Sequence, residues 1–547
     1  MVDYRSGWAI GGCVAFKRAL LFAAVAIHCL SARAAITPVG DVSPLPIMPN
    51  TSLQIGFQGI GSLLIDGGSA LDSNFLQIAQ GPNGVGTAIV RDPGTLWRFF
   101  GGEIGNAGVG RLEVLNGATV EVPSPSNLLR LANNPSANST VMVDGPNSVL
   151  QVVAPFIVGQ QGSALLRVSN GAIVNVPEDN TTVGVGARIE LNNALVRTNQ
   201  LQNGGTIIGS GELAVLSTGT LNNQGRLEAG PEDRLLISGA TVGSIQNNGA
   251  IVAAGGEVEI TRFVTNLATT PNFGRITLRD GTVRFPFPTS TQPGLQNSSL
   301  VAALGGENHV YGRILNLDSG DIVAANNSTV FFHHDVTSQG TISIAAGSMA
   351  IFLEDLVNGG ILQADLAGAK GFGHAEVYGQ ADLGGGKLQL SLSSGYAPNV
   401  GDTFTLLSAA GGITGSLSLA ETPNPSPLLR WDLDIDANKV TLSAVPALAG
   451  DYNANGTVDA ADYIVWRQLL DQTGPGLPAD GDDNGVVDAT DYDFWRARFG
   501  NVLSAGATAA TAAVPEPATL SILVGVVCLL GLSVDFRRVK HALGDNL

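Results

Sequence analysis

"EIGNAGVGRLEVLNGATVEV", residues 103–122, is the stretch of sequence that decides the fold. It contains a Gly/Asn turn, a short strand, an Asn-Gly turn and a second short strand. Aliphatic residues alternate with polar ones in the two strands, at Leu112, Val114, Val120 and Val122. Alternation of this kind places one side of each strand in a core and the other side in water. One such unit cannot bury its apolar side alone, so it needs neighbours of the same kind.

The same unit recurs along the chain. It reads "LQIGFQGIGSLLIDGGSAL" at 53–71 and "FIVGQQGSALLRVSNGAIVNV" at 156–176. An aliphatic residue that anchors the unit returns at separations of 23, 26, 27, 27 and 25 residues, at Ile55, Ile78, Ile104, Leu131, Val158 and Val183. A period near 26 with short strands predicts a mainly β protein, in which each period is one coil of a parallel β-helix (solenoid).

The pattern changes after Thr206 but does not stop. Polar N-x-G or Q-G turns now precede short apolar strands, as in "IQNNGAIVAAGGEVEI" at 245–260. We expect solenoid repeats over residues 35–375, with about twelve to fifteen coils stacked about 4.8 Å apart. Because an open strand edge invites aggregation, we expect a β-rich cap over 376–445. Tight corners require positive φ, which we expect at Gly67, Gly117, Gly145 and Gly171.

Composition agrees with this fold class and excludes some functions. The chain has 71 glycines among 547 residues, and only 14% of its residues are charged. The net charge of −18 argues against nucleic-acid binding, which needs basic patches. The three cysteines, Cys13, Cys29 and Cys528, lie near the two ends of the chain, so a disulfide framework is not expected.

The repeats within 53–190 resemble autotransporter-type and PEP-CTERM-associated β-strand repeats, whose motif I/V-G-x-x-G-x-G-x-L-x-V-x-x-G-A is matched at Ile104–Ala118. Parallel β-helices include polysaccharide-degrading enzymes, so the fold permits catalysis without implying it. The solenoid segment has few acidic residues and no stack of acids at one-coil spacing. Its adjacent histidines, His333 and His334, would point to opposite faces of a strand, which disfavours a shared metal site. We therefore expect no enzymatic activity.

Two acidic clusters follow the solenoid segment, "DYNANGTVDAAD" at 451–462 and "DGDDNGVVDATD" at 480–491. EF-hand-type loops supply oxygens from positions 1, 3, 5, 7, 9 and 12 and have glycine at position 6. Both clusters meet this spacing, with aspartate at position 12. We expect two Ca²⁺ sites, in which position 7 can use its backbone carbonyl oxygen. The ligands would come from Asp451, Asn453, Asn455, Thr457, Asp459 and Asp462 in the first loop and from Asp480, Asp482, Asn484, Val486, Asp488 and Asp491 in the second.

A short amphipathic helix is predicted after each loop, in "DYIVWRQLL" and "DYDFWRARF". A loop followed by one helix, twice, with Asp at position 12, resembles a type I dockerin over 451–500, within a module at 446–500. The resemblance implies contacts to a cohesin-like partner at Ala460, Ala461, Arg467, Ala489, Thr490 and Arg496. The hydroxyl pairs usual in that family are mostly missing here, so intramolecular or cell-surface attachment is an alternative.

Both ends of the chain have the features of targeting segments. Residues 1–34 combine basic residues, an apolar run and an A-x-A cleavage pattern, which predicts a secretory signal peptide. A flexible linker is expected at 501–513, and an apolar segment at 518–534 is long enough to span a bilayer as a helix. Basic residues follow it, and a V-P-E-P motif precedes it at Val514, Pro515, Glu516 and Pro517.

This C-terminal arrangement resembles the PEP-CTERM sorting signal, over residues 514–541. The resemblance implies recognition by an exosortase, transient anchoring in the membrane, and delivery to the cell surface or extracellular matrix. Together these features predict a secreted, non-enzymatic structural or adhesive protein. The alternatives are a β-helix enzyme acting on polysaccharide and a calcium-dependent scaffold component. Extracellular polysaccharide is a further candidate partner.

Overall fold

The computed structural model describes residues 34–502 except 217–220, 240–243, 269–272, 287–292, 394, 421, 424, 427–428 and 475–476. The chain divides into two compact units between Val445 and Pro446. The expected sorting signal, its apolar span at 518–534 and all but the last residue of the expected signal peptide lie outside the described residues. None of the helices in the described part has the length and apolar character of a membrane span.

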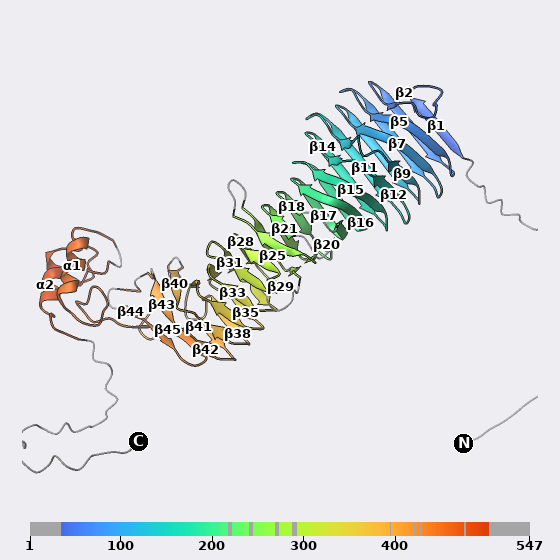
Figure 1. Cartoon of the computed structure of the whole chain (residues 1–547). Helices are drawn as coiled ribbons and strands as arrows, with labels where there is room; N and C mark the ends of the chain where they lie inside the picture. The colour runs from blue at the N-terminus through green and yellow to red at the C-terminus, as the bar shows by residue number, and fades with distance from the viewer. Residues whose placement is uncertain are drawn as a thin grey trace, which may run out of the picture. The chain divides into compact units, whose positions relative to one another are not determined.

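The first unit is a parallel β-solenoid, as the repeat predicts (Figure 1). Each turn contributes a strand to each of three faces, which we call A, B and C, and the chain visits them in the order C, A, B. Strands of successive turns pair in parallel on every face, and among the described residues the register shifts only where β15 (Ile173–Val183) and β16 (Arg188–Asn203) bend around a corner. Within 35–375, the described residues contribute fourteen strands to face A, which agrees with the twelve to fifteen coils expected for that segment.

Face A runs through the expected repeat segment 35–375 and continues for two strands after it. It consists of β4 (Ile60–Asp66), β6 (Val85–Arg91), β8 (Val109–Leu115), β11 (Asn138–Asp144), β14 (Ser163–Ser169), the first parts of β16 (Arg188–Asn203) and β17 (Thr206–Val215), β19 (Arg226–Ala229), β22 (Ala250–Ala254), β25 (Arg275–Arg279), β28 (Leu300–Leu304), β31 (Asp321–Ala325), β34 (Thr341–Ile344), β37 (Ile361–Leu366), β40 (Gly386–Leu392) and β43 (Leu417–Ala420).

Face B shares several long strands with its neighbours, because these strands bend around a corner of the solenoid. It consists of the first parts of β5 (Ala70–Ile78), β7 (Leu96–Ile104) and β15 (Ile173–Val183), the middle of β16 and the end of β17, and β9 (Thr119–Val122), β12 (Val149–Val152), β20 (Arg234–Gly239), β23 (Glu257–Ile260), β26 (Thr282–Arg284), β29 (Glu307–Tyr311), β32 (Thr329–Phe332), β35 (Met349–Phe352), β38 (His374–Val377) and β41 (Thr403–Ala409).

Face C has the shortest strands, most of them three or four residues long. It consists of β3 (Leu53–Ile55), the ends of β5, β7, β15 and β16, and β10 (Leu129–Leu131), β13 (Phe156–Val158), β18 (Leu221–Asn223), β21 (Ser244–Asn247), β24 (Phe263–Asn266), β27 (Leu295–Asn297), β30 (Ile314–Asn316), β33 (Val336–Ser338), β36 (Leu356–Asn358), β39 (Ala381–Asp382) and β42 (Ile413–Thr414).

Antiparallel strands cover parts of both ends of the stack. At the N-terminal end, β1 (Ala35–Gly40) pairs with β4 and β2 (Val42–Ser43) pairs with β3. At the other end, β44 (Leu429–Ile435) precedes β45 (Lys439–Pro446), which pairs antiparallel with β41. Parallel pairing therefore continues past residue 375, through β43, and the antiparallel pairing lies in the last part of 376–445. These strands occupy edges that would otherwise offer free backbone groups to other chains.

The aliphatic anchor residues of the repeat form one continuous column in the core at face C. Each is the register partner of the next one along the chain, and all are at most 1% exposed. The column contains all six predicted anchors, from Ile55 to Val183. The alternation within strands is also confirmed, because Leu112, Val114 and Val120 are fully buried. The four corner glycines have positive φ, as expected.

Asparagine replaces the aliphatic residue of this column from the next turn onward. Val183 is the register partner of Asn203, and each following turn except one places asparagine at the same position as far as Asn358. Five hydrogen bonds of 2.6–2.8 Å connect the first six of these asparagines, each from the side-chain amide of one residue to the side-chain oxygen of the next. The six are Asn203, Asn223, Asn247, Asn266, Asn297 and Asn316. We call these six residues the asparagine ladder.

The asparagine ladder satisfies its buried polar atoms in full. Asn223, for example, accepts a bond from Asn203 and donates both to Asn247 and to the carbonyl oxygen of Ala250. All six side chains are at most 1% exposed, where an unpaired amide would cost about 1–3 kcal/mol. Register slippage would remove these bonds, so the ladder specifies the pairing of the later turns.

Ser338 ends the asparagine ladder. Asn316 donates to its hydroxyl at 3.1 Å, but the hydroxyl is too short to reach the next turn. Asn358, at the same position one turn further on, is 1% exposed, and neither polar atom of its side chain has a hydrogen-bond partner. Asn358 therefore provides a matched comparison, with the burial of a ladder residue and none of its side-chain bonds.

Replacing a ladder asparagine should cost much more stability than replacing Asn358. Asn247→Ala leaves the amide of Asn223 without an acceptor and the oxygen of Asn266 without a donor, so we expect a loss of about 2–4 kcal/mol. Asn358→Ala removes a similar volume but no hydrogen bond, and it should cost less than half as much. Urea unfolding of the full chain, followed by far-UV circular dichroism, measures both. Equal losses in the two variants would contradict a stabilising role for the ladder.

Candidate metal centre

The second unit contains two helices in its described residues, α1 (Ala460–Leu469) and α2 (Ala489–Arg496). Each helix begins directly after an acidic loop. Asp459 and Asp488 are the N-cap residues, and their carboxylates accept bonds from backbone N–H groups of the first turn. The aspartate at position 12 of each loop, Asp462 or Asp491, completes a capping box by accepting from the backbone N–H of the N-cap residue.

Acidic side chains of the first loop point inward. The two carboxylate oxygens of Asp451 accept bonds from the backbone N–H groups of Asn455 and Gly456, at 3.0 and 2.6 Å. Asp462 closes the loop from the helix, with one oxygen 3.0 Å from the backbone nitrogen of Asn453. Asn453 and Asn455 turn their side-chain oxygens to backbone N–H groups two residues on. The predicted donors at positions 1, 3, 5 and 12 are thus folded around one loop.

The second loop repeats this arrangement with a further carboxylate. Asp480 accepts bonds from the backbone N–H groups of Asn484 and Gly485, at 3.0 and 2.7 Å. Oxygen atoms of Asp480, Asp482 and Asp491 lie within 4.8 Å of one another, close enough to bind one cation. Asp482 occupies the position of Asn453 in the first loop, so the second loop has the stronger negative charge.

The burial of these carboxylates favours a cation. Asp462, Asp480 and Asp491 are at most 1% exposed, and burial raises the pKa of Asp451 and of Asp491 above the ordinary aspartate value. A carboxyl group with a raised pKa costs folding free energy once it ionises, so without a cation the loops gain stability as the pH falls. A hard divalent ion such as Ca²⁺, which prefers carboxylate and amide oxygens, would remove that cost at neutral pH. The donor set therefore fits the expected ion.

Backbone hydrogen bonds link each acidic loop to the segment that follows the other loop's helix. Val458, at position 8 of the first loop, exchanges bonds of 2.8 Å with Gly500 and Asn501, after α2. Val487, at position 8 of the second loop, exchanges bonds of 2.8 and 2.9 Å with Asp471 and Gln472, after α1. Both valines are fully buried.

Two tryptophans make a second reciprocal link. The indole N–H of Trp466 in α1 donates to the carbonyl oxygen of Asp488 in the second loop at 2.7 Å. The indole N–H of Trp495 in α2 donates to that of Asp459 in the first loop at 3.0 Å. Since both carbonyls belong to N-cap residues of the loops, the two loops and the two helices form one structural unit.

The helix faces predicted from the sequence meet at these tryptophans. Tyr463 and Trp466 of α1 contact Tyr492 and Trp495 of α2, with ring centroids 5.2–6.0 Å apart. Phe499 lies beyond the end of α2 and contacts Trp495, but it is 56% exposed. Burial is therefore concentrated on Trp466, with Tyr452, Ala479 and Val487 around it.

The six residues that the dockerin resemblance implies for partner binding all lie on the surface of the second unit. They are Ala460, Ala461, Arg467, Ala489, Thr490 and Arg496. The Thr490 hydroxyl donates to the carboxylates of Asp482 and Asp488, which lowers the pKa of Asp488. Arg496 pairs with Asp493 at 3.2 Å, so Arg467 has the freer guanidinium of the two. The expected sorting residues Val514, Pro515, Glu516 and Pro517 lie outside the described part of the chain.

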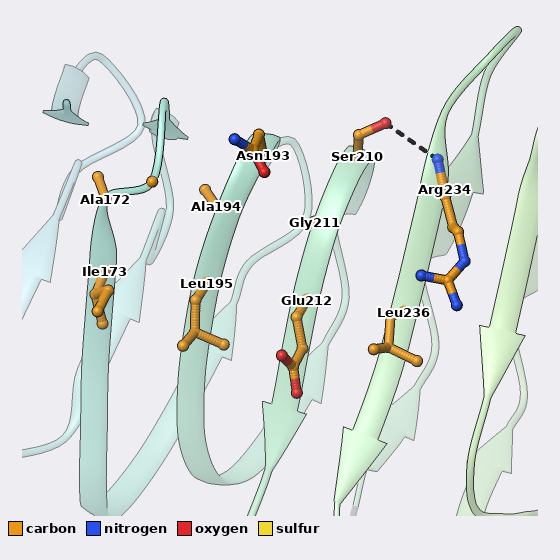
Figure 2. Close-up of a pocket in the computed structure, with 11 residues that line it drawn as sticks. Ala172, Ile173, Asn193, Ala194, Leu195, Ser210, Gly211, Glu212, Arg234 and Leu236 are labelled. Atoms are coloured by element: carbon orange, nitrogen blue, oxygen red, sulfur yellow. Dashed lines mark hydrogen bonds between the residues drawn. The ribbon is translucent and has the colours of Figure 1, made fainter. Parts of the chain in front are cut away.

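A groove on the solenoid was not predicted from the sequence. It has a volume of about 550 Å³ and crosses successive turns at the corner between faces A and B (Figure 2). Ile173, Leu195 and Leu236 line its apolar side, and Glu212 lies between the last two in the register. Glu212 accepts a bond from the hydroxyl of Ser238, and it is the one carboxylate among the described residues that line the groove.

No protein-family model matches the chain, and no curated protein sequence matches it either. The fold itself is that of a parallel β-solenoid, followed in the chain by a small unit with two acidic loops.

Calcium titration of the full chain should detect two bound ions. Asp480→Asn removes a buried carboxylate from the second loop, so we expect one ion to be lost or to bind at least about tenfold more weakly. Asp493→Asn is the matched control, because this exposed aspartate of α2 belongs to neither loop. Isothermal titration calorimetry at millimolar Ca²⁺ measures both variants. An absence of calcium binding to the unchanged protein would overturn the assignment of the loops.

Proposed function

We propose that the protein is a secreted, non-enzymatic structural or adhesive protein of the cell surface or extracellular matrix. The solenoid is its stalk, and the calcium-stabilised dockerin-like module serves attachment or assembly. The observation that carries this proposal is the regularity of the solenoid, in which side chains of successive turns stack at the same register position from residue 53 onward. Such a structure gains length by adding turns and needs no catalytic centre.

The second unit supports an attachment role. Its two loops are connected through backbone pairs and through the indoles of Trp466 and Trp495, so calcium in either loop would stabilise the whole unit. Extracellular calcium at millimolar levels would keep both loops filled even if the affinity is modest. The unit has no disulfide among its described residues, so the cation would take the place of a covalent crosslink in an exported protein.

The ends of the chain support export. The signal peptide expected at 1–34 would direct secretion, and the PEP-CTERM-like signal at 514–541 would hold the protein in the membrane until an exosortase processes it. Delivery to the surface or the extracellular matrix follows from that sequence of events. Both steps are inferred from the sequence.

A second candidate function is a calcium-dependent scaffold that binds a cohesin-like partner. The observation that favours it is the exposure of all six positions implied by the resemblance, including Ala460, Ala461 and Arg467 on α1.

Extracellular polysaccharide is a further candidate ligand, since the groove at Ile173, Leu195 and Leu236 crosses several turns. A polysaccharide-active enzyme is disfavoured there, because glycoside hydrolysis usually needs two carboxyl groups. Glu212 is the one carboxylate among the described residues that line the groove.

Truncation of the expected sorting signal tests this proposal. We expect the full chain, expressed in its native host, to be recovered from the cell-surface or matrix fraction, and a variant ending at residue 513 to be released into the medium. Immunoblotting of the fractions is the measurement. Lys370→Gln, an exposed position of the solenoid outside the expected sorting signal, is the control and should fractionate as the unchanged chain does. Recovery of the full chain from the cytoplasm would contradict the proposal.

Reproducible cleavage of any glycan by the purified full chain would contradict the absence of enzymatic activity.

A further inference from the structure

The outer side of face B carries a cluster of planar side chains between β26 and β32. His309 stacks on Phe331, its register partner, with ring centroids 5.0 Å apart. Tyr311 stacks on His333 at 3.8 Å with an angle of 8° between the rings. Arg284, the register partner of Tyr311, lies over the other side of that ring at 3.7 Å. These contacts hold both imidazoles in defined orientations.

The two imidazoles converge on each other across neighbouring turns. Nδ1 of His309 lies 3.1 Å from Nε2 of His333. The sequence places His333 beside His334, but the ring of His334 accepts a bond from the backbone N–H of Gly312 at 3.1 Å instead. Since His309 and His333 are 24 residues apart in the chain, only the stacking of turns brings them together.

The separation of the two nitrogens suits a metal ion. With metal–nitrogen bonds of about 2.0–2.1 Å, a separation of 3.1 Å gives a nitrogen–metal–nitrogen angle of roughly 100°. This angle lies between the values of square-planar and tetrahedral coordination, the geometries of Cu²⁺ and Zn²⁺ sites with imidazole ligands. In the absence of a metal, the same distance allows one ring to donate a hydrogen bond to the other.

Glu307 occupies the position of a supporting residue for such a site. Its carboxylate oxygen lies 3.0 Å from Nε2 of His309, on the same outward side of β29. A carboxylate bonded to the far nitrogen keeps the proton there and leaves Nδ1 free to bind a metal, as in carboxylate–histidine–zinc arrangements. In this position Glu307 would favour the tautomer of His309 that a metal requires.

The charges around the cluster are compatible with cation binding. Arg284 stacks on Tyr311 within the cluster, and its charge is balanced by Glu257 at 2.9 Å. The side chain of His309 is 29% exposed, so solvent or an external ligand can reach a metal bound there.

We infer that His309 and His333 form a binding site for one divalent transition-metal ion of the Zn²⁺ or Cu²⁺ type, with Glu307 as a positioning residue. The remaining coordination positions face outward, which makes the site suitable for linking the solenoid through the metal to an external donor. This site is separate from the acidic loops of the second unit, and its existence does not depend on the proposed function.

Zinc titration of the tag-free full chain tests the inference. With excess Ca²⁺ present to occupy the acidic loops, isothermal titration calorimetry should detect one Zn²⁺ ion per chain. His309→Asn and His333→Asn should each weaken binding at least about tenfold, and Glu307→Gln should weaken it by about tenfold through loss of the supporting carboxylate. His334→Asn is the matched control and should bind as the unchanged protein does, because its ring is turned to Gly312.

Two further measurements test the site in the unchanged protein, without a histidine substitution. Zn²⁺ should protect His309 and His333 from diethyl pyrocarbonate, as read by peptide mass spectrometry, whereas Ca²⁺ should not. Cu²⁺ bound in place of Zn²⁺ should give an electron paramagnetic resonance spectrum with coupling to two imidazole nitrogens. Equal Zn²⁺ affinity in His309→Asn and the unchanged protein, or no protection of either histidine, would overturn the inference.

Discussion

Hydrogen bonds between stacked asparagine amides set the pairing of successive turns in the later half of the solenoid. Backbone bonds alone would allow a strand to pair in more than one register, since every residue carries the same donor and acceptor. The amides remove that freedom, because a shift of one residue would turn Asn223 or Asn247 outward and leave its partners unpaired in the core. In the earlier half, the same position is filled by residues such as Ile78 and Ile104, which specify register by burial instead.

The fixed interior leaves the outer surface free to vary. The groove beside Leu195 and the facing imidazoles of His309 and His333 both lie on outward positions of face B, where a side chain can change without disturbing the ladder. The second unit has the same dependence on buried polar groups in another chemical form. There the buried polar groups are the carboxylates of Asp480 and Asp491. A bound cation would offset the cost of burying them, as hydrogen bonds between neighbouring amides do in the solenoid.

The sequence predicted the regular part of this structure well. The column from Ile55 to Val183 could be found because its spacing stays near one value and aliphatic residues signal burial. The asparagine ladder could not be found in the same way, because its spacings vary between 19 and 31 residues and a buried asparagine is favourable only with partners beside it. The acidic loops were recognisable from local spacing, whereas the contact of His309 with His333 depends on which turns are stacked. Calcium binding by the loops stays a prediction.

Disulfide trapping tests the proposed register most directly. Gln202, Asn222 and Gln246 are register partners on the outer side of face C in three successive turns. Cysteines at 202 and 222, in a chain whose Cys13, Cys29 and Cys528 are all replaced by serine, would have Cα atoms about 4.8 Å apart, within the range that a disulfide spans. Cysteines at 202 and 246 would be about 9.6 Å apart, beyond that range. The account predicts rapid crosslinking of the first pair alone on mild oxidation, read by mass spectrometry of the linked peptides. Crosslinking of the second pair, or of neither, would contradict it.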